Sequence, residues 1–202
     1  GALALAAYRR GIPAHIVMNE TAPQAKKDAV RDYGGKITFC PPVEKERKAA
    51  LERVVQETGA TFIHPYDNFQ VVSGQGTAAI ELMEAINDLD IVMTPVGGGG
   101  LLSGTATAVK ALNPAVQVIA AEPYLARDAQ LSFRTGELHT AFKPATIADG
   151  LLTSLSPFTF SIIRRYVDDI LTVSEKNIVR AMRLIWERMK IVIQPSAAVG
   201  LA

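Results

Sequence analysis

Short apolar runs alternate with longer amphipathic segments along this chain, and the alternation is typical of an α/β fold. Runs rich in β-branched residues predict strands at residues 14–18, 36–40, 61–64, 91–96, 116–121 and 169–173. Apolar residues spaced three and four apart predict helices at residues 2–10, 24–33, 43–58, 71–86, 101–112, 158–166 and 174–189, with a short helix ending at 135. Strands separated by helices pair in parallel, so we expect parallel sheets with flanking helices.

A turn-rich break divides the chain into two predicted domains. Three strand–helix steps precede it, and the letters HPYDN at residues 64–68 then interrupt the pattern. We therefore predict a small α/β domain at residues 1–65 and a larger one at residues 66–202. Within the larger domain, Gly74 and Gly76 predict close backbone packing of one helix, and residues 136–156 are expected to be irregular.

A strand, four glycines and a helix follow one another in residues 90–104, and this order is typical of an anion site. Without Cβ atoms the loop backbone can enter positive φ and approach a ligand closely. The N–H groups of the loop and of the first helical turn then point at the ligand, and the helix dipole adds a favourable potential. Ser103 would add a hydroxyl donor. A phosphate monoester is the ligand that suits this arrangement best.

Other interpretations of the glycine loop stay open at this point. The loop lacks the lysine of the nucleotide P-loop, which argues against that site. Gly98 and Gly100 nearly match a dinucleotide-binding fingerprint, in which Glu122 would bind the ribose of a nicotinamide dinucleotide. The plainest alternative is a flexible connector, although four glycines between two apolar elements carry an entropic cost that a simple connector does not need.

The composition is that of an ordinary globular protein, with 49% hydrophobic and 20% charged residues among 202. A net charge of +1 gives no sign of nucleic acid or an acidic membrane surface as a partner. No apolar run approaches the length of a transmembrane helix. The single cysteine, Cys40, excludes an internal disulfide and is typical of a reducing compartment. We expect a cytoplasmic protein that binds neither nucleic acid nor membrane.

Five motifs in the second predicted domain resemble the fold-type II pyridoxal-phosphate enzymes, in particular the serine racemase and threonine (serine) dehydratase group. The motifs are PVGGGGLLSG at 95–104, AAEPYLARD at 120–128, TIADGL at 146–151, WERMK at 186–190 and QPSAAVG at 194–200. Residues 11–35 and 64–77 are also similar to segments of that group. The resemblance covers essentially the whole chain. It implies two α/β domains of the tryptophan synthase β-like architecture, incomplete at both termini.

The resemblance also implies where the cofactor binds. Four backbone amides would hold the phosphate of pyridoxal phosphate, namely those of Gly97, Gly98, Gly99 and Gly100. The Leu101 amide would add a further donor. Gly150 of TIADGL matches the family glycine that lies beside the cofactor ring.

A divalent-cation site is implied by the motif AAEPYLARD. Glu122, Asp128 and the backbone carbonyl of Ala126 match the cation site of racemase-like members. Two carboxylates and a carbonyl in one loop suit Mg²⁺ or Ca²⁺, because these hard cations prefer oxygen ligands. Without the resemblance, two acids in a polar loop would be interpreted as solvated side chains.

The sequence departs from the family at the residues that perform the chemistry. The motif of the Schiff-base lysine and the loop that binds the substrate carboxylate are both absent. A lysine must be desolvated or otherwise lowered in pKa to attack an aldehyde, and no lysine here stands in such a context. We therefore assign no catalytic residue and expect the chain to be inactive alone. Gln194 stands where many members have a glutamate, which argues against an acid–base role at that position.

The resemblance implies that the parent enzyme acts on a small hydroxy amino acid such as serine, threonine or 3-hydroxyaspartate. Loss of the β-hydroxyl would give a 2-oxo acid and ammonia, whereas reprotonation on the opposite face would give racemisation. The sequence does not distinguish these reactions. The alternative is a truncated module that folds and self-associates without catalysis, because missing sheet strands would leave unpaired edges. A homo-oligomer is expected in either case.

Overall fold

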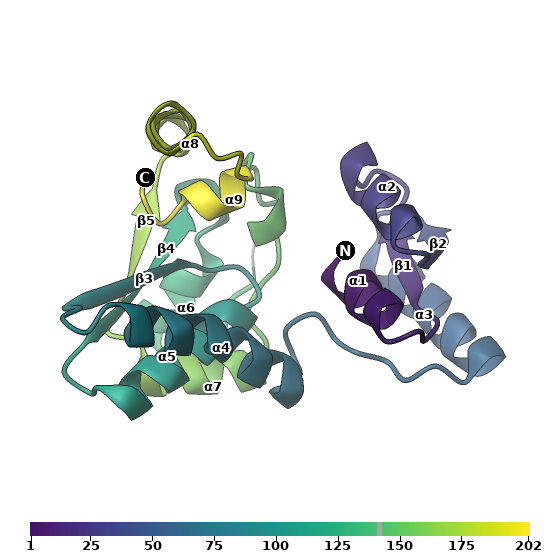
Figure 1. Ribbon diagram of the computed structural model, residues 1–202, viewed down its shortest axis with the longest axis horizontal. Helices are drawn as coiled ribbons and strands as arrows, with labels where there is room; N and C mark the ends of the chain where they lie inside the picture. The colour runs from purple at the N-terminus through teal and green to yellow at the C-terminus, as the bar shows by residue number, and fades with distance from the viewer. Residues whose placement is uncertain (141–142) are drawn as a thin grey trace. The chain divides into compact units, whose positions relative to one another are not determined.

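The computed structural model describes residues 1–140 and 143–202, in two compact units of residues 1–63 and 64–202 (Figure 1). Residues 141–142, inside the stretch predicted to be irregular, lie outside the described residues. The two units divide two residues before the predicted domain boundary. The predicted fold class of parallel sheets with flanking helices is confirmed.

The first unit is a two-stranded parallel sheet with three helices. Its elements are α1 (Ala2–Arg9), β1 (His15–Asn19), α2 (Gln24–Asp32), β2 (Lys36–Cys40) and α3 (Glu44–Thr58). The strands pair in register from His15 opposite Lys36 to Asn19 opposite Cys40. Gly59, in the left-handed region at φ +66°, ends α3.

The strand predicted at residues 61–64 is wrong. Residues 59–64 have no regular secondary structure, and the first sheet contains only β1 and β2 among the described residues. Phe62 and Ile63 have the composition of a strand, yet their side chains are exposed. A strand forms its backbone hydrogen bonds with a neighbouring strand, and the described sheets, β1-β2 and β3-β4-β5, do not include this segment.

The second unit contains a three-stranded parallel sheet in the order β3-β4-β5. Its elements are α4 (Phe69–Ala85), β3 (Ile91–Pro95), α5 (Gly100–Leu112), β4 (Gln117–Pro123), the 3-10 turn η1 (Tyr124–Ala126), α6 (Asp128–Thr135), the 3-10 turn η2 (Asp149–Leu151), α7 (Pro157–Tyr166), β5 (Asp169–Val173), α8 (Glu175–Met189) and α9 (Pro195–Ala198). Every other predicted strand is present. Ser174 caps α8, with Oγ accepting from the Asn177 N–H.

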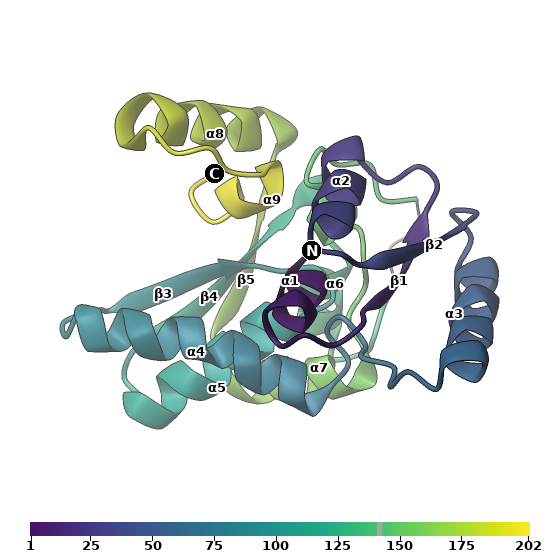
Figure 2. The same ribbon diagram turned by 45° about the vertical axis from the view of Figure 1, so that its right-hand side comes forward.

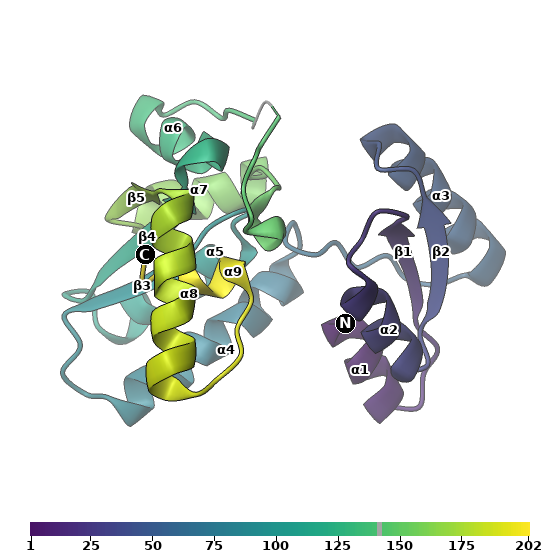
Figure 3. The same ribbon diagram turned by 90° about the horizontal axis from the view of Figure 1, so that it is seen from above.

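Two hydrophobic cores cover the two faces of this sheet. On one face α4, α5 and α7 pack over buried residues that include Val92, Leu102 and Ile163. On the other face α8 and α9 enclose a smaller core around Ile178 and Val199. Figures 1 and 2 show the sheet between these helices, and Figure 3 shows α8 lying across its upper face. No helix in the described part of the chain has both the length and the apolar character needed to cross a membrane.

Helices α4 and α5 approach each other backbone to backbone. A Cβ atom placed on Gly76 would lie 2.9 Å from the Gly104 carbonyl oxygen, and one placed on Gly104 would overlap the Val72 carbonyl. The predicted close packing is therefore confirmed at Gly76. It is wrong at Gly74, where nothing lies within 4 Å of such a Cβ.

Candidate functional site

The glycine loop begins where β3 ends and becomes the first turn of α5. Val96 extends the sheet by donating its N–H to the Ala121 carbonyl at 3.0 Å, and Gly99 then turns the chain with φ +86°. The Gly99 carbonyl accepts the first bond of the helix, from the Ser103 N–H at 2.8 Å. Only glycine adopts this left-handed backbone without strain. All four glycines are buried, so the loop is a packed part of the fold and not a flexible connector.

A cavity of about 480 Å³ in the second unit opens beside this loop. It is lined by all six residues for which the sequence predicts cofactor contact: Gly97, Gly98, Gly99, Gly100, Leu101 and Gly150. The rest of the lining comes from Pro65, Tyr66, Gln75, Pro95, Leu102, Leu151, Thr153, Gln194, Ser196 and Ala197. No lysine is among these lining residues.

The walls of the cavity leave no room for side chains on the loop. A Cβ on Gly98 would overlap the ring of Tyr66, and a Cβ on Gly100 would lie 2.9 Å from the Tyr66 Cβ. On the opposite side, a Cβ on Gly97 would lie 3.0 Å from the Leu151 Cα. The loop therefore presents bare backbone, which is the surface that an anion needs for binding to N–H groups. This donor set fits the phosphate of pyridoxal phosphate.

Two side chains from distant elements bond to the segment that contains Gly150, and one of them bonds to Gly150 itself. The Gly150 N–H donates to Ser196 Oγ of α9 at 3.0 Å, and Glu175 Oε2 of α8 accepts from the Ile147 N–H at 2.9 Å. Ser196 lies in the motif QPSAAVG, which carries no local sign of its bond to Gly150. Tyr66 lies in the turn-rich break at residues 64–68, where the sequence predicts a domain boundary and no contact with the site.

Ser103 does not serve as a donor to the site, so that expectation is wrong. Its side chain is fully buried on α5 and does not line the cavity. Ser103 Oγ instead donates to the Thr159 carbonyl of α7 at 3.3 Å. Residue 103 lies one helical turn beyond Gly99, where its side chain faces the core.

The three predicted cation ligands come from one short segment after β4. Glu122 is the penultimate residue of β4, Ala126 lies in η1 and Asp128 begins α6, and all three residues are buried. Glu122 Oε1 accepts from the Ala129 N–H at 2.9 Å, and Oε2 accepts from the Gln130 N–H at 2.8 Å. This carboxyl therefore caps the first turn of α6.

Glu122 is electrostatically unusual. Burial raises the pKa of its carboxyl to about 8, although the two backbone amides that donate to it act in the opposite direction. The nearby Asp128 charge adds to the increase in the Glu122 pKa. Among the described residues, no group of three or more His, Cys, Asp or Glu side chains gathers in a metal-binding arrangement. A cation here would depend on two carboxylates and a carbonyl, a set of oxygen donors that fits Mg²⁺ or Ca²⁺.

These features place a bare-backbone glycine loop beside a cavity, and the comparison with known proteins gives the family of the chain. The chain belongs to the family described as pyridoxal-phosphate dependent enzyme, which it matches over residues 1–202. It is 48% identical over 200 residues to the beta-hydroxyaspartate dehydratase of Paracoccus denitrificans (strain Pd 1222), covering 99% of this chain and 64% of that protein. It is 46% identical over 202 residues to the serine racemase of Homo sapiens, covering 100% of this chain and 59% of that protein.

Solved structures give the same result for the fold. The structure of maize serine racemase superposes with a TM-score of 0.97 at 43% identity, covering 99% of this chain and 61% of that chain. The threonine deaminase of T.th. gives a TM-score of 0.93 at 42% identity, covering 98% of this chain and 66% of that chain. The predicted family resemblance is confirmed. The chain spans 59–64% of the length of the two curated relatives named above.

Proposed function

We propose that this chain supplies the phosphate-binding part of a pyridoxal-phosphate enzyme that acts on small hydroxy amino acids such as serine, threonine or 3-hydroxyaspartate. The observation that supports it most strongly is the bare-backbone loop of residues 97–100 on the wall of a cavity. Pyridoxal phosphate, when bound, supplies an electron sink for negative charge at the amino acid Cα. The names of the relatives, a hydroxyaspartate dehydratase and serine racemases, support the substrate class.

Each side of the cavity has its own role in this proposal. The amides of Gly97, Gly98, Gly99 and Gly100, with that of Leu101, bind the phosphate, and the N-terminus of α5 adds a favourable potential. Gly150 lies beside the cofactor ring, where a larger residue would collide with Ser196 Oγ, 2.9 Å from a Cβ at this position. The Tyr66 ring lies against the Gly98 backbone and forms one wall of the cavity.

The same proposal holds that the 202 residues alone bind the cofactor without turning over substrate. A base is needed to remove the α-proton of the amino acid, and no lysine lines the cavity. Lys110, for example, is occupied elsewhere, with Nζ donating to the Val116 carbonyl at 2.9 Å and pairing with Asp168 at 2.8 Å. The match to the pyridoxal-phosphate family favours pyridoxal phosphate over a nicotinamide dinucleotide as the ligand of the glycine loop.

An absorbance titration of the purified chain with pyridoxal phosphate tests the proposal, followed by borohydride reduction and mass measurement. We expect saturable binding that inorganic phosphate displaces, and no lysine-linked adduct at stoichiometric yield. A stoichiometric reduced adduct on one lysine would contradict the absence of a base. Binding that phosphate does not displace would contradict the role of the glycine loop.

We further propose that Glu122, the Ala126 carbonyl and Asp128 hold Mg²⁺ or Ca²⁺. The support is the gathering of buried oxygen donors within seven residues at the end of β4. Such a cation would tie β4 to the first turn of α6 and would stabilise the second unit without taking part in proton transfer.

Self-association is the second candidate function, and the exposed edge of the sheet favours it. Within the described residues β3 pairs only with β4, and Ile91 and Met93 of β3 are 47% and 39% exposed. An unpaired edge with apolar side chains is a template for pairing with another chain. Sedimentation velocity should therefore detect dimers or larger species, and Met93→Lys should shift them towards the monomer. A wild-type chain that stays monomeric at high concentration would contradict this.

A further inference from the structure

Thr159 of α7 is fully buried and bonded to the back of the glycine loop. Its Oγ1 donates to the Gly98 carbonyl at 3.0 Å, across 61 residues of sequence. The same oxygen accepts from the Ser156 N–H at 3.0 Å, and Ser156 Oγ accepts from the Thr159 N–H at 3.1 Å. These reciprocal bonds form the capping box of α7, which fixes the Thr159 side chain at the helix N-terminus.

The single hydroxyl hydrogen of Thr159 has two carbonyl acceptors within reach, and the Gly98 carbonyl is the closer. The Ser156 carbonyl lies 3.3 Å from Oγ1, against 3.0 Å for Gly98. Because the Thr159 side chain is buried, water does not replace either bond. A buried carbonyl without a donor is costly, so the bond to Thr159 stabilises one orientation of the peptide between Gly98 and Gly99.

The orientation of that peptide determines where the Gly99 amide points. The described chain contains no cis peptide bond, and in a planar trans peptide the C=O and the following N–H point in opposite directions. The Gly98 carbonyl faces Thr159 in the protein interior. On the same inner side, a Cβ on Gly99 would lie 2.7 Å from Leu155 Cδ2 and 2.9 Å from Thr159 Cβ. The Gly99 N–H therefore faces away from α7, towards the cavity that Gly98 and Gly99 line.

We propose that Thr159 is a positioning residue for cofactor binding: its hydroxyl fixes the Gly98 carbonyl inward and so directs the Gly99 amide at the phosphate. This inference rests on the proposed function, because it assigns the phosphate to the same loop. Ser103 supports Thr159 from α5 by donating to its carbonyl. Thr159 itself does not line the cavity and acts only through the loop.

The test compares the dissociation constants of pyridoxal phosphate and of pyridoxal, which lacks the phosphate, for the 202-residue chain and three variants. Thr159→Val removes the hydroxyl at nearly constant volume, whereas Thr159→Ser keeps it. Thr58→Val is the matched control, since Thr58 Oγ1 also donates to a backbone carbonyl, that of Val54, but lies in the first unit.

We expect Thr159→Val to reduce the preference for pyridoxal phosphate over pyridoxal about tenfold, the effect of losing one charge-assisted hydrogen bond. Thr159→Ser and Thr58→Val should keep the wild-type preference within twofold. An unchanged preference in Thr159→Val would overturn the positioning role while leaving the proposed function intact. A wild-type chain that does not prefer the phosphorylated form would overturn the proposed function and this inference together.

A second measurement needs no variant and holds even where Thr159→Val fails to fold. Inorganic phosphate is added to the ¹⁵N-labelled wild-type chain, and the amide resonances are followed by NMR. We expect the Gly99 amide proton to move downfield with saturation, because its N–H would donate to the anion. A Gly99 resonance that stays in place while other loop amides shift would overturn the inference.

Discussion

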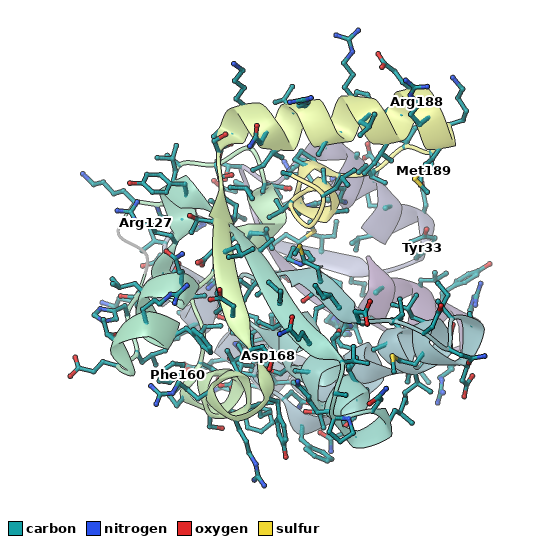
Figure 4. The ribbon with its side chains drawn as sticks, turned by 90° about the vertical axis from the view of Figure 1, so that its left-hand side faces the viewer. Tyr33, Arg127, Phe160, Asp168, Arg188 and Met189 are labelled. Atoms are coloured by element: carbon teal, nitrogen blue, oxygen red, sulfur yellow. The ribbon has the colours of Figure 1, made fainter. Side chains whose placement is uncertain are left out.

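Lys110 and Asp168 form an ion pair that connects α5 to the N-terminal ends of β4 and β5. Lys110 Nζ, from α5, lies 2.8 Å from Oδ2 of Asp168, the residue before β5, and also donates to the carbonyl of Val116, the residue before β4. Asp168 Oδ2 accepts the Val118 N–H of β4 at 2.6 Å. Figure 4 shows Asp168 at the end of β5 remote from α8. The pair therefore ties the C-terminal end of α5 to two neighbouring strands.

Asp168→Asn should lower the free energy of unfolding by about 1 kcal/mol at pH 7, a modest value because the pair is partly exposed. Burial acts to raise the pKa of Asp168, but the Lys110 and Val118 donors outweigh it and hold the pKa below its usual value of 3.8. The unfolded chain therefore binds a proton at Asp168 more readily than the folded chain does. The contribution of the Asp168 carboxylate to the free energy of unfolding is present above pH 3.8 and is lost as the pH falls through the lower folded-state pKa.

Urea unfolding of the wild type and Asp168→Asn at pH 7 and near pH 3 measures this contribution. The difference in the free energy of unfolding between the two proteins should be smaller at the lower pH. Glu187→Gln is the control, because it breaks the exposed Arg183–Glu187 pair and should not change the unfolding midpoint measurably. A difference that grows on acidification would contradict the account.

The contact between α4 and α5 predicts opposite effects for two glycines in one helix. Gly76→Ala places a methyl group against the Gly104 carbonyl and should lower the free energy of unfolding by about 1–3 kcal/mol. Gly74→Ala faces open space and should raise it by about 0.5–1 kcal/mol, the gain in helix propensity. Denaturant unfolding compares the two variants, and equal effects would show that the helices are not in close contact.

The proposed cation site predicts that Mg²⁺ or Ca²⁺ raises the thermal midpoint of the chain. At about 100 times Kd the added free energy is about 2.7 kcal/mol. Asp128→Asn should abolish the effect, whereas Glu137→Gln, which changes an exposed acid just beyond α6, should leave it in place. An equal rise in the thermal midpoint of the wild type and of Asp128→Asn with either cation would contradict the assignment of Asp128 as a cation ligand.

Local sequence patterns predict the elements that form the framework of the site. They do not predict the contacts between residues that are distant in the sequence. The strand, the four glycines and the helix at residues 91–112 were predictable because all their signals are adjacent in the sequence. The partner of Thr159 lies 61 residues away and that of Gly150 lies 46 residues away, so neither contact leaves a local pattern. Ser103 was misassigned because its spacing from the glycines does not reveal which face of α5 it occupies.

The wrong strand at residues 61–64 has a related cause. Thr61, Phe62 and Ile63 have high β-propensity, but propensity describes a side chain that fits a pleated surface and does not supply the neighbouring strand. Gly74 and Gly76 show that, in a helix too, the residue type alone does not reveal which position contacts a neighbouring element. They differ by two positions, about 200° around the axis, so only one of them can face α5.

Isothermal titration of pyridoxal phosphate and pyridoxal into the wild type and Gly99→Ala tests the central claim, that the glycine loop binds the cofactor phosphate. Alanine at residue 99 would be strained at φ +86° and would collide with Leu155, so the variant disturbs the loop directly. We expect one site on the wild type that prefers the phosphorylated form at least about tenfold, and loss of that preference in Gly99→Ala. Equal affinity of the wild type for the two compounds would contradict the claim.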